Sequence, residues 1–138
     1  ECALFEPGKA ERITDGEDVL ILACGRMTET ALDAAQMLKD EGVGASVVNV
    51  RSVCPFDRET IENAAQGKKL AVSIEDNIVS GGMGESIFSK CLIDAKKINL
   101  GFDTCFVEQG KQRELMRIHH LDAPSVCGRI LKEIKTNA

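Results

Sequence analysis

The segment at residues 70–84 constrains the fold of this chain more than any other. Its sequence, LAVSIEDNIVSGGMG, joins an apolar run, an acidic pair and a cluster of glycines. An apolar run that leads into a glycine-rich loop predicts a buried strand followed by a helix. In α/β proteins such loops lie at the carboxyl edge of the sheet, where ligands and partners bind. We therefore expect an α/β domain with a binding or docking surface at this loop.

The remaining residues continue the same alternation of strands and helices. Apolar or β-branched runs predict strands at 19–23, 45–50, 70–74 and 104–107. Helical spacing predicts helices at 28–41, 58–66, 84–96, 112–118 and 123–135, with Thr28, Asp57 and Asp122 as N-caps. Residues 3–13 predict an edge strand or an irregular lead-in. The chain of 138 residues is thus expected to form one domain, 1–138, of three-layer α/β/α architecture, with a mostly parallel, possibly mixed, sheet of about five strands.

Composition excludes several classes of function. A formal net charge of −5 argues against a nucleic-acid partner, because phosphate binding needs a basic surface. No apolar run approaches the roughly 20 residues of a membrane span, and no signal peptide is recognisable, so a cytoplasmic protein is expected. The six cysteines contain no CxxC pair and lack close histidines. This pattern favours reduced, structural thiols over a disulfide framework, a metal site or a single reactive thiol.

The acidic pair Glu75 and Asp76 offers two interpretations. Adjacent residues on a strand point to opposite faces, so the two carboxylates cannot act together on one bound group. They are either a charged strand end that pairs with a cation or caps a loop, or part of an interface or a site. Arg51, at the end of the second strand, is expected near Glu75, either tying two strand ends together or reaching another domain.

The glycine cluster Gly81, Gly82 and Gly84 also leaves two alternatives. It matches neither GxGxxG nor the phosphate loop GxxxxGK[ST], and no Lys or Arg lies in the loop. Exposed N–H groups could hold an anion, but a sharp turn and close packing of the helix on the sheet explain the glycines better. His119 and His120 lack partners at metal spacing and are expected at the surface. With no GxSxG either, the residues predict no catalytic, cofactor-binding or metal-binding constellation.

Four consecutive blocks carry a family resemblance. They are VLILACGRMTETALDAAQML, GVGASVVNVRSVCPFD, KKLAVSIEDNIVSGGMGESI and GFDTCFVEQGKQRELMRIHHLDAPSV. In this order they resemble the C-terminal domain of transketolase-like thiamine diphosphate enzymes, and most closely that of the 1-deoxy-D-xylulose-5-phosphate synthases. The matched positions are Arg51, Pro55, Phe56 and Asp57; Glu75, Asp76, Gly81, Gly82 and Gly84; Gly101, Phe106 and Gly110; and Leu121, Asp122 and Ala123. The chain departs from the pattern at Cys54, where a basic residue is usual, and at His120, where glycine is common.

The resemblance implies a role within a larger enzyme. Such synthases have three α/β domains, form homodimers, and condense pyruvate with glyceraldehyde 3-phosphate using thiamine diphosphate and Mg²⁺, in isoprenoid precursor synthesis. The cofactor-binding segment and the activating glutamate lie in the other domains, so no catalytic, cofactor or metal residue is carried over to this chain. The expected partners are therefore the cofactor-binding domains of the same enzyme, and the domain is expected to be inactive alone. The interface candidates are Arg51, Glu75, Asp76, Gly81, Gly82 and Gly84.

Two other classes of function remain open at this point. A free-standing regulatory module would bind a nucleotide or phosphate at residues 81–84. Alternatively, the same domain could belong to transketolase itself or to the β subunit of a 2-oxoacid dehydrogenase, because the segment Arg-x-x-x-Pro-x-Asp is shared among these enzymes. The closing Leu121-Asp122-Ala123 block is the main feature that separates the synthases from them.

Overall fold

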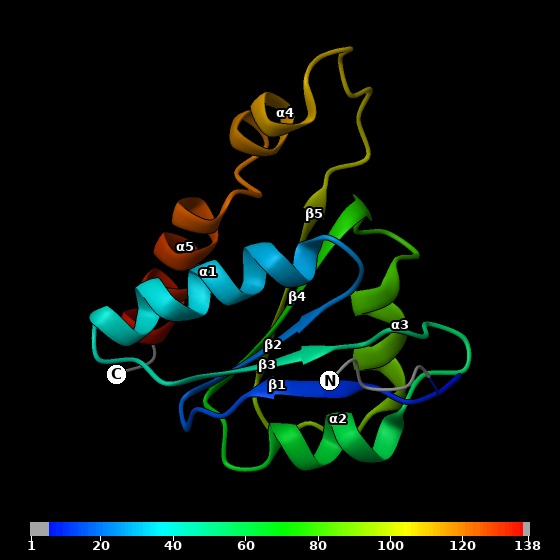
Figure 1. Cartoon of the computed structure of the whole chain (residues 1–138), viewed down its shortest axis with the longest axis vertical. Helices are drawn as coiled ribbons and strands as arrows, with labels where there is room; N and C mark the ends of the chain where they lie inside the picture. The colour runs from blue at the N-terminus through cyan, green and yellow to red at the C-terminus, as the bar shows by residue number, and fades with distance from the viewer. Residues whose placement is uncertain (1–5, 137–138) are drawn as a thin grey trace.

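Five strands form one mixed sheet in the computed structural model, which describes residues 6–136 (Figure 1). The strands are β1 (Glu11–Thr14), β2 (Val19–Ala23), β3 (Ala45–Asn49), β4 (Leu70–Ile78) and β5 (Lys96–Phe102). The helices are α1 (Met27–Asp40), α2 (Arg58–Ala65), α3 (Met83–Lys90), α4 (Gln112–Ile118) and α5 (Ala123–Thr136).

The strand order is β1-β3-β2-β4-β5, and only the pairing of β1 with β3 is antiparallel. Helices α1 and α5 cover one face of the sheet, while α2 and α3 cover the other (Figure 1). The predicted α/β/α class with a mixed sheet of five strands is therefore confirmed. The lead-in also contains the predicted edge strand, as β1; the first five residues of the chain lie outside the described part.

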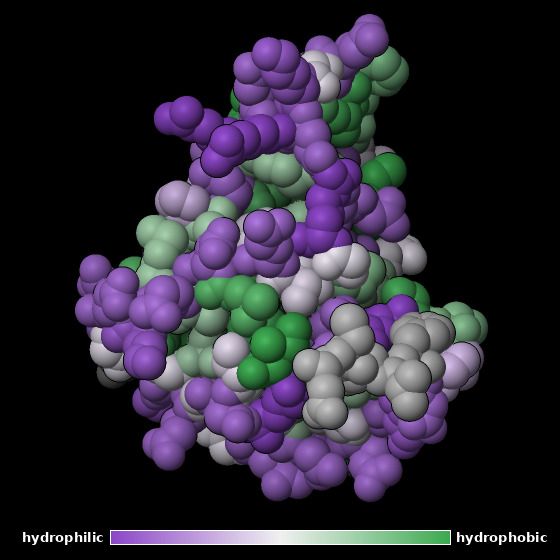
Figure 2. Space-filling model, viewed as in Figure 1, coloured by the Kyte–Doolittle hydropathy of each residue, from purple (hydrophilic) through white to green (hydrophobic). Residues whose placement is uncertain are grey.

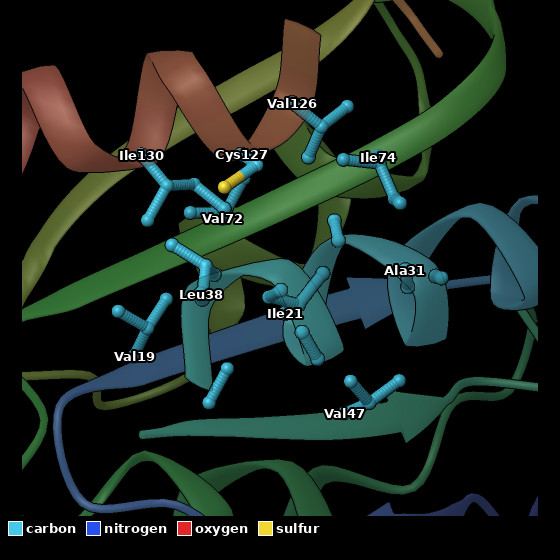
Figure 3. Close-up of a cluster of buried hydrophobic side chains, with 14 of the residues drawn as sticks. Val19, Ile21, Ala31, Leu38, Val47, Val72, Ile74, Val126, Cys127 and Ile130 are labelled. Atoms are coloured by element: carbon cyan, nitrogen blue, oxygen red, sulfur yellow. The ribbon is translucent and has the colours of Figure 1, made fainter. Parts of the chain in front are cut away.

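Strand β2 lies at the centre of the sheet and is buried on both faces. Val19 and Ile21 pack with α1 and α5 in one core (Figure 3). Leu20 and Leu22 belong to the core beneath α2 and α3. All five residues of β2 are fully buried. This double burial explains why the sequence shows a continuous apolar run instead of alternation.

The boundary between the third helix and the next strand was predicted wrongly. Helix α3 ends at Lys90, and residues 91–95, which were expected to continue it, lie in no helix or strand. Lys96, the last residue of the expected helix, begins β5, whereas residues 104–107 form no strand. Leu92 fits the helical spacing but is 85% exposed, and Phe106 is 95% exposed. The true signal is the alternation of Ile98, Leu100 and Phe102, which pack with α5 on one face of the sheet.

The predicted N-caps have different outcomes. Asp57 accepts a hydrogen bond from the Thr60 N–H at 3.1 Å and caps α2 as expected. Thr28 lies inside α1, one residue after its start, and its buried hydroxyl has no hydrogen-bond partner among the described residues. Asp122 precedes α5, but its buried Oδ1 also lacks a partner there. The prediction that Thr28 caps α1 is therefore wrong. In the contacts described, Asp122 accepts a hydrogen bond from the Val126 N–H only through its main-chain oxygen, so its side chain makes no capping bond there.

Helix α4 and the loop before it project from the body of the domain (Figure 1). None of the residues of α4 is buried. Figure 2 shows this projection at the top of the view, with apolar and polar residues side by side. Within residues 6–136, no helix has the length and apolar character that crossing a membrane requires.

Candidate functional site

A cavity of about 730 Å³ opens at the carboxyl edge of the sheet. It lies where β2 leads into α1 on one face and β4 leads into α3 on the other. This divergence of neighbouring connections is the switch point at which α/β sheets bind ligands. Its lining comes from the loops after β2, β3 and β4, from the last part of β4 and from α3, and it includes Arg26, Val53, Cys54, Phe56, Glu75, Asp76, Gly81, Gly82, Met83 and Lys90. The glycine loop, which the sequence predicts as a binding or docking surface, thus lines a concave part of the surface.

Glu75 borders this cavity, but its carboxylate is occupied within the chain. The side chain is 3% exposed and accepts hydrogen bonds from the Met83 N–H at 2.8 Å and the Gly84 N–H at 3.1 Å. These two groups belong to the first turn of α3, whose N-terminal N–H groups have no partner in the helix itself. Glu75 therefore fastens α3 to the end of β4, which is the loop-capping alternative left open by the sequence.

The glycines of the loop make this contact possible. A Cβ on Gly82 would lie 2.4 Å from Glu75 Oε2, and one on Gly84 would lie 1.9 Å from Ser73 Oγ. Gly81 adopts a left-handed backbone with φ of 75°, and its N–H donates to Glu85 at 2.8 Å. The N–H groups that could hold an anion are already used, which supports the packing interpretation of the glycines.

Asp76 points away from Glu75 and lies at the surface. Its Oδ2 accepts from Arg26 Nε at 2.7 Å and pairs with Arg26 Nη2 at 2.6 Å. The ion pair joins the loop that follows β2 to the last part of β4. Sequence reasoning missed Arg26 as a site residue, although the Cys24-Gly25-Arg26 segment directly follows the strand predicted at 19–23, where site residues often lie.

Arg51 lies apart from Glu75. Its side chain pairs with Glu11 on β1, and its backbone is left-handed with φ of 55°. Because β1 runs antiparallel to β3, its first residues lie beside the carboxyl end of β3. The Ala10 N–H accordingly donates to Asp57 Oδ2 at 3.1 Å. Arg51 thus holds the incoming chain at this edge instead of joining β3 to β4.

Cys24, which lines the cavity, is not an activated thiol. Burial raises the pKa of the Cys24 thiol, and the neighbouring Glu75 and Asp76 raise it further. Burial likewise raises the pKa of Cys91 and Cys127. A raised pKa keeps these thiols protonated and unreactive. All five cysteines among the described residues are free, and in that part of the chain no three metal-ligating side chains are grouped around a common point.

Comparison with known proteins assigns the fold to a class. Residues 8–126 match the model of the family described as "Transketolase, C-terminal domain". The chain belongs to this family. A solved split-gene transketolase, described as an inactive beta4 tetramer, superposes with a TM-score of 0.83 at 32% identity, covering 93% of this chain and 43% of that one. The Pichia stipitis transketolase, at 22% identity and a TM-score of 0.68, shares the fold.

Individual curated proteins also match this chain. The chain is 37% identical over 136 residues to a 1-deoxy-D-xylulose-5-phosphate synthase of Caldanaerobacter subterraneus subsp. tengcongensis, covering 95% of this chain and 22% of that enzyme. It is 33% identical to a "Putative transketolase C-terminal section" of Methanocaldococcus jannaschii, covering 98% of this chain and 43% of the relative. The chain thus spans about a fifth to less than half of the length of these relatives.

Proposed function

We propose that this chain is the C-terminal domain of a thiamine diphosphate-dependent 1-deoxy-D-xylulose-5-phosphate synthase. The observation that carries the proposal is the 37% identity over 136 residues to such a synthase. Residues 1–138 would form a single domain of a cytoplasmic, homodimeric enzyme. The preceding domains would bind thiamine diphosphate and Mg²⁺ and condense pyruvate with glyceraldehyde 3-phosphate. The domain alone would be inactive.

Within that enzyme, the carboxyl edge of the sheet would dock against the cofactor-binding domains. The first described residues of the chain lie at this edge, because a Cβ on Gly8 would meet Pro55 Cγ at 3.6 Å and the Ala10 N–H donates to Asp57 Oδ2 at 3.1 Å. The neighbouring loop also exposes apolar surface, since Val53 is 40% exposed and Cys54 and Pro55 are exposed as well. An adjoining domain attached at this point has an apolar surface within immediate reach.

The interface candidates then divide into two groups. Asp76 and Gly81 are exposed and would meet the neighbouring domain directly, while half-buried Arg51, which follows β3 and pairs with Glu11, would meet it on the side of β1. Glu75, Gly82 and Gly84 are buried and would act by fixing the shape of the loop. The homodimer would form once this domain is docked against the other domains of the enzyme.

The test compares substitutions at the two ends of the sheet in the complete enzyme. Val53→Asp places a charge on the proposed docking edge, while Leu92→Asp places one on an exposed leucine near the start of β5. We expect Val53→Asp to reduce turnover and dimer content and Leu92→Asp to leave both unchanged. Arg51→Ala adds a second probe of the docking edge. Wild-type assembly and turnover in both edge variants would refute docking at this surface.

A second candidate, transketolase, is favoured by a specific observation. The split-gene transketolase and the putative transketolase C-terminal section match nearly the whole of this chain at 32–33% identity. Assaying the complete enzyme with pyruvate and glyceraldehyde 3-phosphate, and separately with a ketose phosphate donor and an aldose phosphate acceptor, distinguishes the two. The synthase assignment requires decarboxylation of pyruvate; transfer between sugars without it would assign transketolase.

A further inference from the structure

A second cavity, of about 580 Å³, lies between the end of β5 and the outer side of α5. Its volume lies within the range typical of small-metabolite sites. The wall from β5 includes Leu100 and Gly101, the loop after α4 supplies His119 and His120, and α5 supplies Arg129 and Lys132. It shares no residue with the cavity at the docking edge.

The charges around this cavity are unbalanced. Arg129 and Lys132 face a single lining carboxylate, Asp103, and the only ring side chains in the lining are two histidines. The cavity beneath α4, by contrast, is lined by three arginines and by three carboxylates. In a chain of net charge −5, a local cationic excess of this kind marks a place that attracts anions.

The nearby carboxylates do not cancel this excess. Arg129 Nε bonds to Glu133 Oε1 at 2.9 Å, but Glu133 also pairs with Lys96 at 2.7 Å. The Glu133 carboxylate is therefore shared between two cations, Arg129 and Lys96. Glu108 lies 3.4 Å from His119 Nε2, and it is not among the residues that line the cavity. Lys132 is exposed, and none of the described ion pairs includes it.

His120 occupies a backbone conformation that favours glycine. It follows the last turn of α4 with φ of 58°, its N–H donates to the Arg117 oxygen at 3.3 Å, and the Leu121 N–H donates to the Met116 oxygen at 2.7 Å. This is a Schellman motif, whose left-handed position is usually glycine. A histidine there carries backbone strain, and such strain points to a use for the side chain. Here the side chain borders the cationic cavity.

We propose that this cavity binds the phosphate group of a small phosphorylated metabolite. Arg129 and Lys132 would contact the phosphate oxygens, the preferred partners of guanidinium and ammonium groups. His120 would donate a further hydrogen bond from the opposite wall, and the Ser125 hydroxyl would face the organic part of the ligand. The proposal is independent of the enzyme to which the domain belongs.

The experiment titrates the purified chain with inorganic phosphate and, separately, with glycerol 3-phosphate, following backbone amide shifts by NMR. Saturable shifts are expected at residues 119–121 and 125–132. Lys132→Gln is expected to weaken binding about tenfold, because it removes a charged hydrogen bond. Lys135→Gln, an exposed lysine on the same helix but outside the cavity, is the matched control and should bind as the wild type does.

Two further variants separate binding from folding. Gly128→Leu should block the cavity, because a Cβ at Gly128 meets no atom within 4 Å and the longer side chain would occupy the space beyond. His120→Gly should weaken phosphate binding without lowering the unfolding temperature. Arg51→Gly, which relieves the backbone strain of a left-handed residue elsewhere in the chain, should leave phosphate binding unchanged. No saturable phosphate binding, or equal affinity in Lys132→Gln, His120→Gly and Gly128→Leu, would overturn the proposal.

Discussion

The docking edge and the cavity between β5 and α5 both contain charged residues, but these residues differ in whether they have partners within the chain. At the edge, Glu75 and Asp57 accept hydrogen bonds from backbone N–H groups, and Asp76 is paired with Arg26. At the cavity, Arg129 shares its carboxylate and Lys132 faces open space. A polar residue whose partners lie within its own chain serves the fold. One without such partners is available for a ligand, and this difference can be tested.

Glu75→Ala is expected to have the largest effect on stability. It removes both acceptors from the buried Met83 and Gly84 N–H groups, so the free energy of unfolding should fall by about 3 kcal/mol. Urea denaturation measures the change. Glu75→Gln keeps one oxygen acceptor and should lose less. A loss from Glu75→Ala no greater than that from a substitution at exposed Asp76 would contradict the structural role.

Asp57→Ala should lower the free energy of unfolding by about 1–2 kcal/mol through loss of the α2 cap. Burial by itself would raise the pKa of Asp57, but hydrogen bonds from Thr60 and Ala10 lower it below its ordinary value of 3.8. Because the pKa is lowered in the folded state, the stabilisation is complete above pH 3.8 and is lost as the pH falls through the folded value.

The measurement for Asp57 is a pair of urea denaturation series at neutral pH and at acid pH. The difference between wild type and Asp57→Ala should be large at neutral pH and should shrink below the ordinary pKa of the carboxylate. A difference that stays constant or grows in acid would show that the charged form of Asp57 does not stabilise the fold.

Much of the fold and part of the arrangement at the docking edge were predictable from the sequence. The contacts that were not predicted have physical causes. Strand geometry placed Glu75 and Asp76 on opposite faces, and the buried runs located β2, β3 and β4. The sequence could not show that Arg51 pairs with Glu11, because that contact depends on the antiparallel docking of β1. The cationic cavity was missed for the same reason, since β5, the loop after α4 and α5 meet only in the folded chain.

Gly128→Ala should raise the free energy of unfolding by about 1 kcal/mol, because alanine favours the helix and its Cβ meets no atom within 4 Å. Thermal or urea unfolding measures the gain. Phosphate binding should persist in this variant and be lost in Gly128→Leu. Loss of stability in Gly128→Ala would mean that the space beside α5 is filled.

Asp76→Asn should change stability least, by less than about 0.5 kcal/mol, because the Arg26–Asp76 pair is partly exposed to solvent. Urea unfolding at low and high salt measures this difference, which should be smaller still at high salt. A loss comparable to that from Glu75→Ala would place Asp76 among the residues that hold the loop together.

Hydrogen–deuterium exchange of the chain alone and within the complete enzyme tests the docking claim most directly. We expect exchange to slow on assembly at residues 51–56 and 76–81, which carry the exposed part of the edge. Residues 119–132, around the cavity beside α5, should exchange at the same rate in both. Unchanged exchange at the edge, or protection confined to the cavity, would contradict the account.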